Sequence, residues 1–308
     1  MSLHGLLLVE KGPGVTSFQV VAHLRRVLRV PKVGHGGTLD PMATGVLPIL
    51  LGEATKLTPY LLGHDKEYVA TLRLGIRTDT LDLTGQIREE RPVPPLEAEA
   101  VRAVLARFVG EIEQVPPMYS ALHVGGRRLH ELARAGVEVA RAPRRVRIMA
   151  LELLAFEPPR LRIRVRCGAG TYIRALGADL GEALGCGAAT EALVRARVGP
   201  FGLEDALPWA EVLAGDPERL RVHILPPDRA VEHLPAVSVT AEGARRLARG
   251  QGLVPEEFLS PAPFDPPQPV RLYAEGRFLG LGQMAPGGRL APRRLLHGDP
   301  ARPRPVSP

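Results

Sequence analysis

The sequence lacks the features that mark several large classes of protein. Two cysteines among 308 residues, Cys167 and Cys186, are too few for a disulfide framework or a zinc site, and we expect both to fill core space. No stretch approaches the roughly 20 apolar residues that a membrane-spanning helix needs. The apolar run at residues 6–9 is too short for a signal peptide. We therefore expect a soluble, cytoplasmic protein with no membrane contact.

Motifs of nucleotide and metal binding are also missing. The sequence contains no phosphate-binding G-x-x-x-x-G-K-[ST] loop and no dinucleotide fingerprint with its acidic ribose ligand. None of the nine histidines pairs at H-x-x-x-H spacing with a nearby acid, so metal chemistry is not expected. The sequence predicts a protein that needs no cofactor.

Positive charge, in contrast, is in excess. Lys and Arg number 40 against 33 Asp and Glu, which gives a net charge of +7. Eleven arginines and four glutamates lie between residues 127 and 166, so this stretch alone carries an excess of seven, and a second basic patch covers residues 271–304. Local positive charge favours a polyanionic partner, because each neutralised phosphate releases counterions. A solvated arginine-rich surface is the alternative.

Hydrophobic periodicity predicts a mixture of strands and helices. Apolar residues alternate at 66–76 and 160–167, as is typical of strands, and arginines occupy the whole opposite face of the second strand. Residues 6–9 read as a buried strand. Helical spacing of apolar residues predicts helices at 16–28, 96–109, 129–136 and from 173 onward.

The composition changes near residues 226–235, which indicates a domain boundary. Beyond it the sequence predicts a helix at 241–249 and short strands at 270–274 and 278–284. Short strands between Gly- and Pro-rich turns favour a small β-barrel. The last residues, 298–308, are expected to form a disordered tail.

One carboxylate stands out in the segment GHGGTLDPMATG at residues 34–45. Asp40 is its only acid and precedes Pro41, and an Asp-Pro pair suits a type I turn. Its neighbours are apolar or weakly polar, and a carboxylate in such surroundings needs a partner to stay ionised. Arginine can supply that partner, and a paired carboxylate can act as a nucleophile. The pattern leaves both interpretations of Asp40 open.

Two tyrosines and one arginine are similarly ambiguous. Tyr68 lies on the apolar face of its predicted strand, either as a core residue or as a stacking platform for a base. Tyr172 and Arg174 lie where a strand turns into a helix. Arg174 falls off the apolar stripe of that helix, which favours exposure to solvent.

Taken in order along the chain, these motifs resemble a known family. GHGGTLDPMATGVLPI at 34–49 resembles the catalytic motif of the TruB-type tRNA pseudouridine synthases almost letter for letter. The family's second motif, its RNA-contacting insertion and its third motif have counterparts in the same order: KEY and GIRTDTLD within 66–82, QVPPMYSAL and HELARAG within 114–136, and GTYIRALGADLG at 170–181. TAEGARRLARG at 240–250 and GRFLGLGQ at 276–283 resemble a PUA domain, a small RNA-binding barrel.

The resemblance covers residues 4–297 and implies a fold. The fold class is α+β, with a mixed, mainly antiparallel central sheet flanked by helices and a small C-terminal PUA-like β-barrel. The implied domains are a catalytic domain at 1–232, which contains the RNA-contacting insertion near 115–147, and an RNA-binding domain at 233–297.

The resemblance also implies an activity. The family isomerises uridine 55 in the T loop of tRNA to pseudouridine without a metal or cofactor, and the reaction requires the base to leave its stack. The implied partner is therefore the T stem-loop of tRNA. We expect no obligatory protein partner, and we expect a monomer.

Site residues carry over from the matching motifs. By this resemblance Asp40 is the nucleophile, and Arg174 is the ion-pair partner that keeps it ionised. Tyr68 stacks on the flipped uracil. Tyr172 and Leu193 line the base pocket. His35 fills the space that the uridine leaves in the RNA loop. Attack by Asp40 at uracil C6 and attack at ribose C1′ both remain open.

The chain departs from the family pattern at three places. KGPG at 11–14 shifts the usual proline by one residue, His123 replaces a common lysine, and His130 replaces a tyrosine. These changes concern RNA contacts rather than the reaction. A non-catalytic RNA-binding or RNA-folding module is the rival hypothesis, and an RNA-folding activity can also accompany catalysis. The combination of Asp40, Tyr68 and Arg174 favours the enzyme, because a pure binder needs no acid facing a polyanion.

Overall fold

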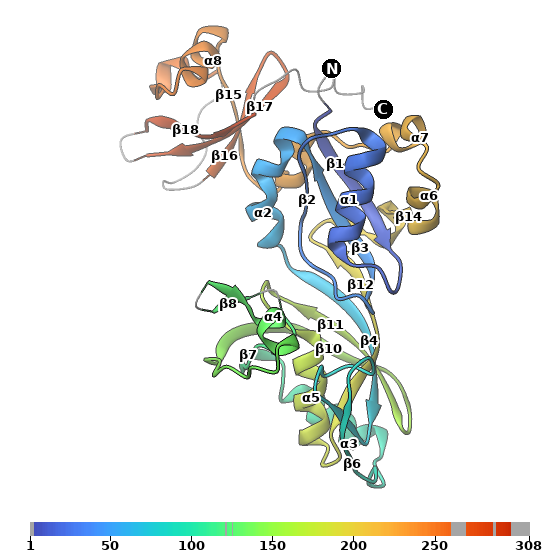
Figure 1. The fold of residues 1–308 in the computed structure, drawn as a ribbon. Helices are drawn as coiled ribbons and strands as arrows, with labels where there is room; N and C mark the ends of the chain where they lie inside the picture. Colours follow the sequence, from blue (N-terminus) through green and yellow to red (C-terminus); the bar gives the residue numbers. More distant parts are fainter. Residues whose placement is uncertain (1–2, 121, 125, 260–268, 286–287, 297–308) are drawn as a thin grey trace.

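The computed structural model describes residues 3–120, 122–124, 126–259, 269–285 and 288–296. Within them the chain forms a large sheet covered by helices and a smaller C-terminal sheet (Figure 1). The tail predicted at 298–308 lies outside the described residues. No helix of the described part is long and apolar enough to cross a membrane.

The large sheet is mixed, which confirms the predicted α+β class. Its ten strands within the described residues are β1 (Gly5–Lys11), β2 (Val33–His35), β3 (Thr44–Leu51), β4 (Lys66–Leu74), β7 (Gly110–Gln114), β10 (Arg144–Glu157), β11 (Arg160–Cys167), β12 (Ala188–Val198), β13 (Phe201–Gly202) and β14 (Leu207–Pro208). Eight of them follow the order β14-β1-β3-β12-β4-β11-β10-β7, while β2 pairs with β3 and β13 with β12. The pairs β1–β14 and β12–β3 are parallel, and the other described pairs of this sheet are antiparallel.

Helices pack on this sheet and form the main core with its strands. The helices of this part of the chain are α1 (Ser17–Leu28), α2 (Thr58–Leu62), α3 (Ala98–Ala106), α5 (Ile173–Ala183), α6 (Trp209–Ala214) and α7 (Pro217–Val222), with short 3₁₀ helices η1 (Gly52–Leu57), η2 (Leu203–Asp205) and η3 (Pro227–Val231). Leu24 of α1, Leu105 of α3 and Leu176 of α5 join one buried cluster with the strands. In Figure 1, α1 lies over the upper half of the sheet, α3 and α5 lie over the lower half, and β4 and β12 run through both halves.

Local sequence explains most of these elements. Thr16 caps α1 in a capping box with Gln19. In β4 and β11 alternate residues are buried, as predicted. The helix predicted at 96–109 is shorter than expected. Its last predicted residues instead form a turn that leads to Gly110, which has φ +108° and starts β7.

Small elements branch off between the strands of the large sheet. β5 (Ile76–Thr78) and β6 (Ile87–Glu90) form one hairpin, and β8 (His123–Val124), β9 (Arg127–Arg128) and α4 (Leu129–Arg134) lie in the predicted insertion. β10 begins at Arg144 and pairs with β7, so residues 144–147 of that predicted insertion belong to the central sheet.

The C-terminal part forms a four-stranded sheet within the described residues. Its elements are β15 (Ala236–Ser238), α8 (Ala241–Ala248), the 3₁₀ helix η4 (Pro255–Glu257), β16 (Pro269–Ala274), β17 (Arg277–Met284) and β18 (Leu290–Leu295), with the strands in the order β15-β16-β17-β18. Val237, Leu247 and Leu272 belong to its own core. A closed PUA-like barrel stays a prediction.

The two sheets also share a hydrophobic cluster. Phe278 and Leu281 of β17 belong to the same buried cluster as Leu8 of β1 and Leu50 of β3. Burial of apolar surface stabilises such a contact at about 25 cal/mol per Å². The C-terminal sheet is therefore joined to the large sheet by a buried cluster, to which Ala230 and Val231 of η3 also belong, rather than tethered by a linker alone.

Candidate active site

Asp40 lies in the loop between β2 and β3. The Ala43 N–H donates to the Asp40 carbonyl at 3.1 Å and closes a turn over Pro41, so the turn-forming interpretation of Asp40 is correct. The next residue back, Leu39, exchanges two hydrogen bonds with the Ser17 hydroxyl at the start of α1. The Asp40 side chain itself is 33 % exposed, which leaves it within reach of a substrate.

Arg174 is the partner of this carboxylate. Its Nε donates to Asp40 Oδ2 at 2.8 Å, from the first turn of α5. The remaining guanidinium nitrogens donate to the carbonyls of Thr80 and Tyr119. The Arg174 side chain is only 4 % exposed, so the solvent exposure that its position on the helix favoured is wrong. The apolar stripe of the helix did not predict the burial of Arg174, because the residues that bury it come from loops rather than from the helix itself.

A second carboxylate, which the sequence analysis did not single out, contacts the same guanidinium. Asp82 Oδ2 lies 3.4 Å from Arg174 Nη1, and the Asp82 side chain is 5 % exposed. Its other oxygen accepts hydrogen bonds from Thr80 and Thr84. Asp82 ends the segment GIRTDTLD, which also contains Asp79, and the pattern gave no reason to separate the two acids. The structure separates them, because Asp79 accepts from the Gln86 N–H of the hairpin instead.

Two predicted aromatic residues lie near Asp40. Tyr68 on β4 is 8 % exposed and belongs to the core cluster, and burial raises the pKa of its phenol, with the charge of Asp40 adding to the effect. Tyr172 directly precedes α5, and its backbone is fixed on both sides by the amide of Gln114, at 2.8 and 3.0 Å. Burial raises the pKa of Tyr172 as well, and Asp40 again adds to it. Both tyrosines therefore carry neutral phenols at pH 7.

The other two predicted residues lie at the edge of this group. Leu193 on β12 is 6 % exposed and pairs with Ala70 of β4 in the strand register. His35 ends β2, where its Nδ1 accepts from the Gly37 N–H at 3.4 Å. Burial, with a contribution from the positive charge of Arg195, lowers the pKa of His35, so its ring is neutral at pH 7. No described contact joins His35 directly to Asp40.

Two buried cations support the loop from behind. The Lys11 ammonium donates to the carbonyls of Gly12, Val15 and Pro41, and burial lowers its pKa to about 8. Arg195 of β12 is 1 % exposed, and its guanidinium binds two carbonyls of the Asp40 loop and one of β3. Neither cation was predicted from the sequence. A charged residue on the inward face of a strand is the signal that identifies them.

Comparisons with known proteins match the chain almost from end to end. A family model described as TruB family pseudouridylate synthase (N terminal domain) matches residues 25–173. Models of the tRNA pseudouridylate synthase B C-terminal domain and of the pseudouridine synthase II TruB C-terminus match 174–232 and 235–296. The tRNA pseudouridine synthase B of Aromatoleum aromaticum is 48 % identical over 95 % of this chain and 92 % of its own length.

The chain belongs to the TruB family of pseudouridylate synthases. A second member, the tRNA pseudouridine synthase B of Chromohalobacter salexigens, is 45 % identical over 96 % of this chain and 95 % of its own length. Among solved structures, an H/ACA RNP bound to a substrate RNA containing 2'-deoxyuridine holds a chain with a TM-score of 0.72 and 28 % identity, covering 96 % of this chain and 85 % of that one. A Cbf5-Nop10-Gar1 complex gives the same TM-score at 29 % identity, covering 96 % of this chain and 82 % of the other.

The arginine stripe of this TruB family member consists of Arg160, Arg162, Arg164 and Arg166 on β11, and it lies away from Asp40. In the register of β4 and β11, Arg164 and Arg166 pair with Val69 and Glu67, whereas Val165 pairs with Tyr68. The arginines therefore project from the sheet face opposite to Tyr68. Two of the stripe's four arginines pair with glutamates: Arg160 with Glu191, and Arg164 with Glu67 and Glu152. This stripe is consequently not part of the Asp40 site.

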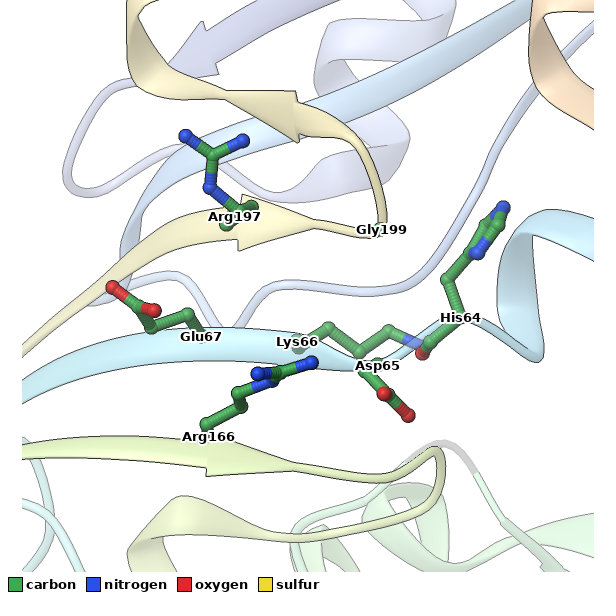
Figure 2. A pocket seen from close by; sticks show the side chains of 7 residues that line it. All are labelled: His64, Asp65, Lys66, Glu67, Arg166, Arg197 and Gly199. Carbon is green, nitrogen blue, oxygen red and sulfur yellow. The ribbon is translucent and has the colours of Figure 1, made fainter. Parts of the chain in front are cut away.

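A polar pocket opens where β4 begins and β11 and β12 end (Figure 2). It has a volume of about 370 Å³ and is lined by His64, Asp65, Lys66, Glu67, Arg166, Arg197 and Gly199. The Lys66 ammonium donates to the carbonyls of Leu62 and His64, and Arg197 pairs with Glu204. None of the residues grouped around Asp40 lines this pocket. Within the described residues, no group of three His, Cys, Asp or Glu side chains could hold a metal ion.

Proposed function

We propose that this protein isomerises uridine 55 in the T loop of tRNA to pseudouridine, with Asp40 as the nucleophile. The observation that carries the proposal is the buried guanidinium of Arg174, which binds the partly exposed carboxylate of Asp40 at 2.8 Å. The ion pair holds the carboxylate in one position, where a substrate can reach it. Membership of the TruB family supports the reaction, and curated members carry tRNA in their names.

The chemistry fits this set of residues. The N1–C1′ bond of the uridine breaks, the base turns, and C5 bonds to C1′, so that C5 loses its proton and N1 gains one. The reaction is redox-neutral and needs no energy input. An enzyme that reaches a base in this way must first take it out of the stack. Tyr68 and Leu193 would contact the flipped uracil, together with Tyr172, while His35 would fill the space in the RNA loop. Attack by Asp40 at uracil C6 and at ribose C1′ both fit this geometry.

We infer that the two parts of the chain divide the work. Residues 1–232 would carry catalysis, residues near 115–147 would contact the RNA loop, and residues 233–297 would form a PUA-like module that contacts the tRNA outside the loop. The basic residues of the C-terminal sheet, which include Arg271, Arg293 and Arg294, support this assignment because phosphate contacts depend on positive charge. The proposed assembly is a monomer that binds tRNA without an obligatory protein partner.

A T stem-loop RNA tritiated at C5 of uridine 55 tests the proposal. Isomerisation releases the tritium to water, whereas binding or folding of the RNA alone does not. The expected result is one tritium released per RNA, and the matched control is the same RNA with tritium at C5 of a uridine in the stem. RNA binding without tritium release would favour the rival hypothesis, an RNA-binding or RNA-folding module.

A further inference from the structure

Arg195 combines complete burial with a positive charge. Its side chain is 1 % exposed and is the largest among the fully buried side chains of the described chain. Nε donates to the carbonyl of Val46 at 2.8 Å, and the two Nη atoms donate to those of Gly37 at 3.0 Å and Thr38 at 3.3 Å. Arg195 forms no ion pair with a carboxylate among the described residues.

The three carbonyls belong to a single functional segment. Gly37 and Thr38 precede Asp40, and Val46 follows it at the start of β3. One planar guanidinium therefore joins both ends of the loop that carries the proposed nucleophile. The start of β3 also packs tightly on the backbone of Arg195, because a Cβ at Gly45 would lie 2.3 Å from the Arg195 carbonyl oxygen. Gly45 has φ +106°, which only glycine adopts readily.

Arg195 also contacts the second group of the proposed site. Its partner in the strand register is Tyr68 of β4, and the positive charge of Arg195 acts on the Tyr68 phenol, lowering its pKa against the larger, raising effect of burial. Burial lowers the pKa of Arg195, and the negative charge of Asp40 partly offsets this effect. The same positive charge contributes to lowering the pKa of Lys11 and of Lys66, behind the larger effect of burial.

A role as a simple core residue does not explain this arrangement. A buried charge without an ionic partner is costly, and an apolar side chain of similar volume fills such a space at lower cost. Arginine differs from lysine in presenting five N–H groups in a rigid fork, which suits several acceptors in one plane. The contacts of Arg195 use that fork on three separate carbonyls.

We propose that Arg195 is a positioning residue for the isomerisation, whose guanidinium fixes the Asp40 loop and the Tyr68 ring relative to each other. This inference rests on the proposed function. Arg195 does not touch the reacting atoms. It acts by holding the nucleophile and the stacking residue at the separation that the flipped base requires. Displacing a reacting group by about 1 Å costs a factor on the order of 100 in rate.

Single-turnover tritium release by the full chain tests this role. Arg195→Lys keeps the charge but not the fork, and we expect its rate constant to fall by about 100-fold with RNA affinity close to that of the wild type. Arg195→Ala should fall at least as far and should recover part of its rate when guanidinium chloride is added at millimolar concentration. Ammonium chloride at the same concentration should not restore it. A merely structural role would not give rescue that depends on the planar ion.

Arg197 provides the matched control. It lies on the same strand beyond a β-bulge, is exposed, lines the polar pocket of Figure 2 and pairs with Glu204. Arg197→Lys and Arg197→Ala should keep the wild-type rate constant and should not respond to guanidinium.

Four outcomes are distinguishable. The expected losses with rescue support the proposal. A folded Arg195→Lys protein with the wild-type rate constant overturns it, and so does the failure of both Arg195 variants to fold, which would make Arg195 a residue of the core alone. A wild-type protein that binds the RNA but releases no tritium contradicts the proposed function itself.

Discussion

Arg174 and Asp40 form an ion pair across 134 residues of chain, with 2.8 Å between Nε and Oδ2. The two partners differ in exposure, because the Arg174 side chain is 4 % exposed and that of Asp40 is 33 % exposed. Carbonyls of Thr80 and Tyr119 hold the other guanidinium nitrogens. The cation is therefore fixed in the protein, and the carboxylate is the half of the pair that a substrate can reach.

Replacing the cation tests this pair directly. Arg174→Lys keeps a positive charge, but its single nitrogen cannot bind Asp40 and both carbonyls in the geometry of a guanidinium. We expect tritium release to fall by at least about 100-fold, while RNA affinity measured by filter binding stays nearly unchanged. Arg174→Leu should lower turnover further. Unchanged turnover in either variant would disprove a role for the ion pair.

Asp82 is expected to matter through Arg174 rather than through the RNA. Asp82→Asn removes the second carboxylate from the guanidinium but preserves the size of the side chain. We expect turnover to fall by about 10- to 100-fold, with little change in RNA affinity. Asp79→Asn is the matched control, because Asp79 lies in the same hairpin and contacts Gln86 and Arg88 instead. Equal effects of the two substitutions would indicate a role in hairpin stability alone.

Local pattern predicted the strands and helices of the site better than its contacts. Alternation located β4 and β11, and the helical spacing of apolar residues located α1, because these signals depend on neighbouring residues. The contact of Arg174 with Asp40 came only from resemblance to the TruB family. Periodicity predicted that Arg174 is exposed to solvent, because a local pattern contains no information about loops from distant parts of the chain that pack against the helix.

Asp82 and Arg195 were missed in the sequence for different reasons. Asp82 was missed because Asp79 lies three residues before it in the same polar turn, and the sequence alone does not distinguish the two acids. Leu81 between them has φ +64°, a left-handed conformation that is uncommon for leucine and is not predicted from its sequence. Arg195 was missed because no strand was predicted at 188–198, so its position on the inward face of β12 could not be recognised. Two bulges interrupt the alternation of β12, between Thr190 and Ala192 and again between Arg195 and Arg197.

Stability should rise with pH in a window set by the buried lysines. Burial lowers the pKa of Lys66 to about 8 from 10.5, so the unfolded chain binds more protons than the folded protein above pH 8. The free energy of unfolding therefore increases between pH 8 and 10. Lys11 contributes with the same sign. The raised pKa of Tyr68 opposes this trend above pH 10.0, where the unfolded phenol ionises first.

Urea unfolding across that window measures the effect. Lys66→Met should flatten the rise, because one of the two titrating amines is removed. Lys32→Met is the control, since Lys32 is 67 % exposed, and it should leave the slope as in the wild type. A slope that is identical in Lys66→Met and the wild type would show that Lys66 does not titrate in this range.

The shared hydrophobic cluster predicts that the two sheets unfold together. Phe278 is 6 % exposed and belongs to the same buried cluster as residues of β1 and β3. Phe278→Ala should lower the free energy of unfolding by about 3–5 kcal/mol in one calorimetric transition. Leu259→Ala, at a residue that is 66 % exposed, should change it by less than about 0.5 kcal/mol. Two separate transitions in the wild type would contradict a shared core.

Asp40→Asn provides the most direct measurement. The substitution preserves the backbone turn and the side-chain volume but removes the negative charge that Arg174 binds. With C5-tritiated T stem-loop RNA, we predict that the wild type releases its tritium, whereas the folded Asp40→Asn protein binds the RNA and releases none above background. Normal tritium release by that variant would contradict the assignment of Asp40 as the nucleophile.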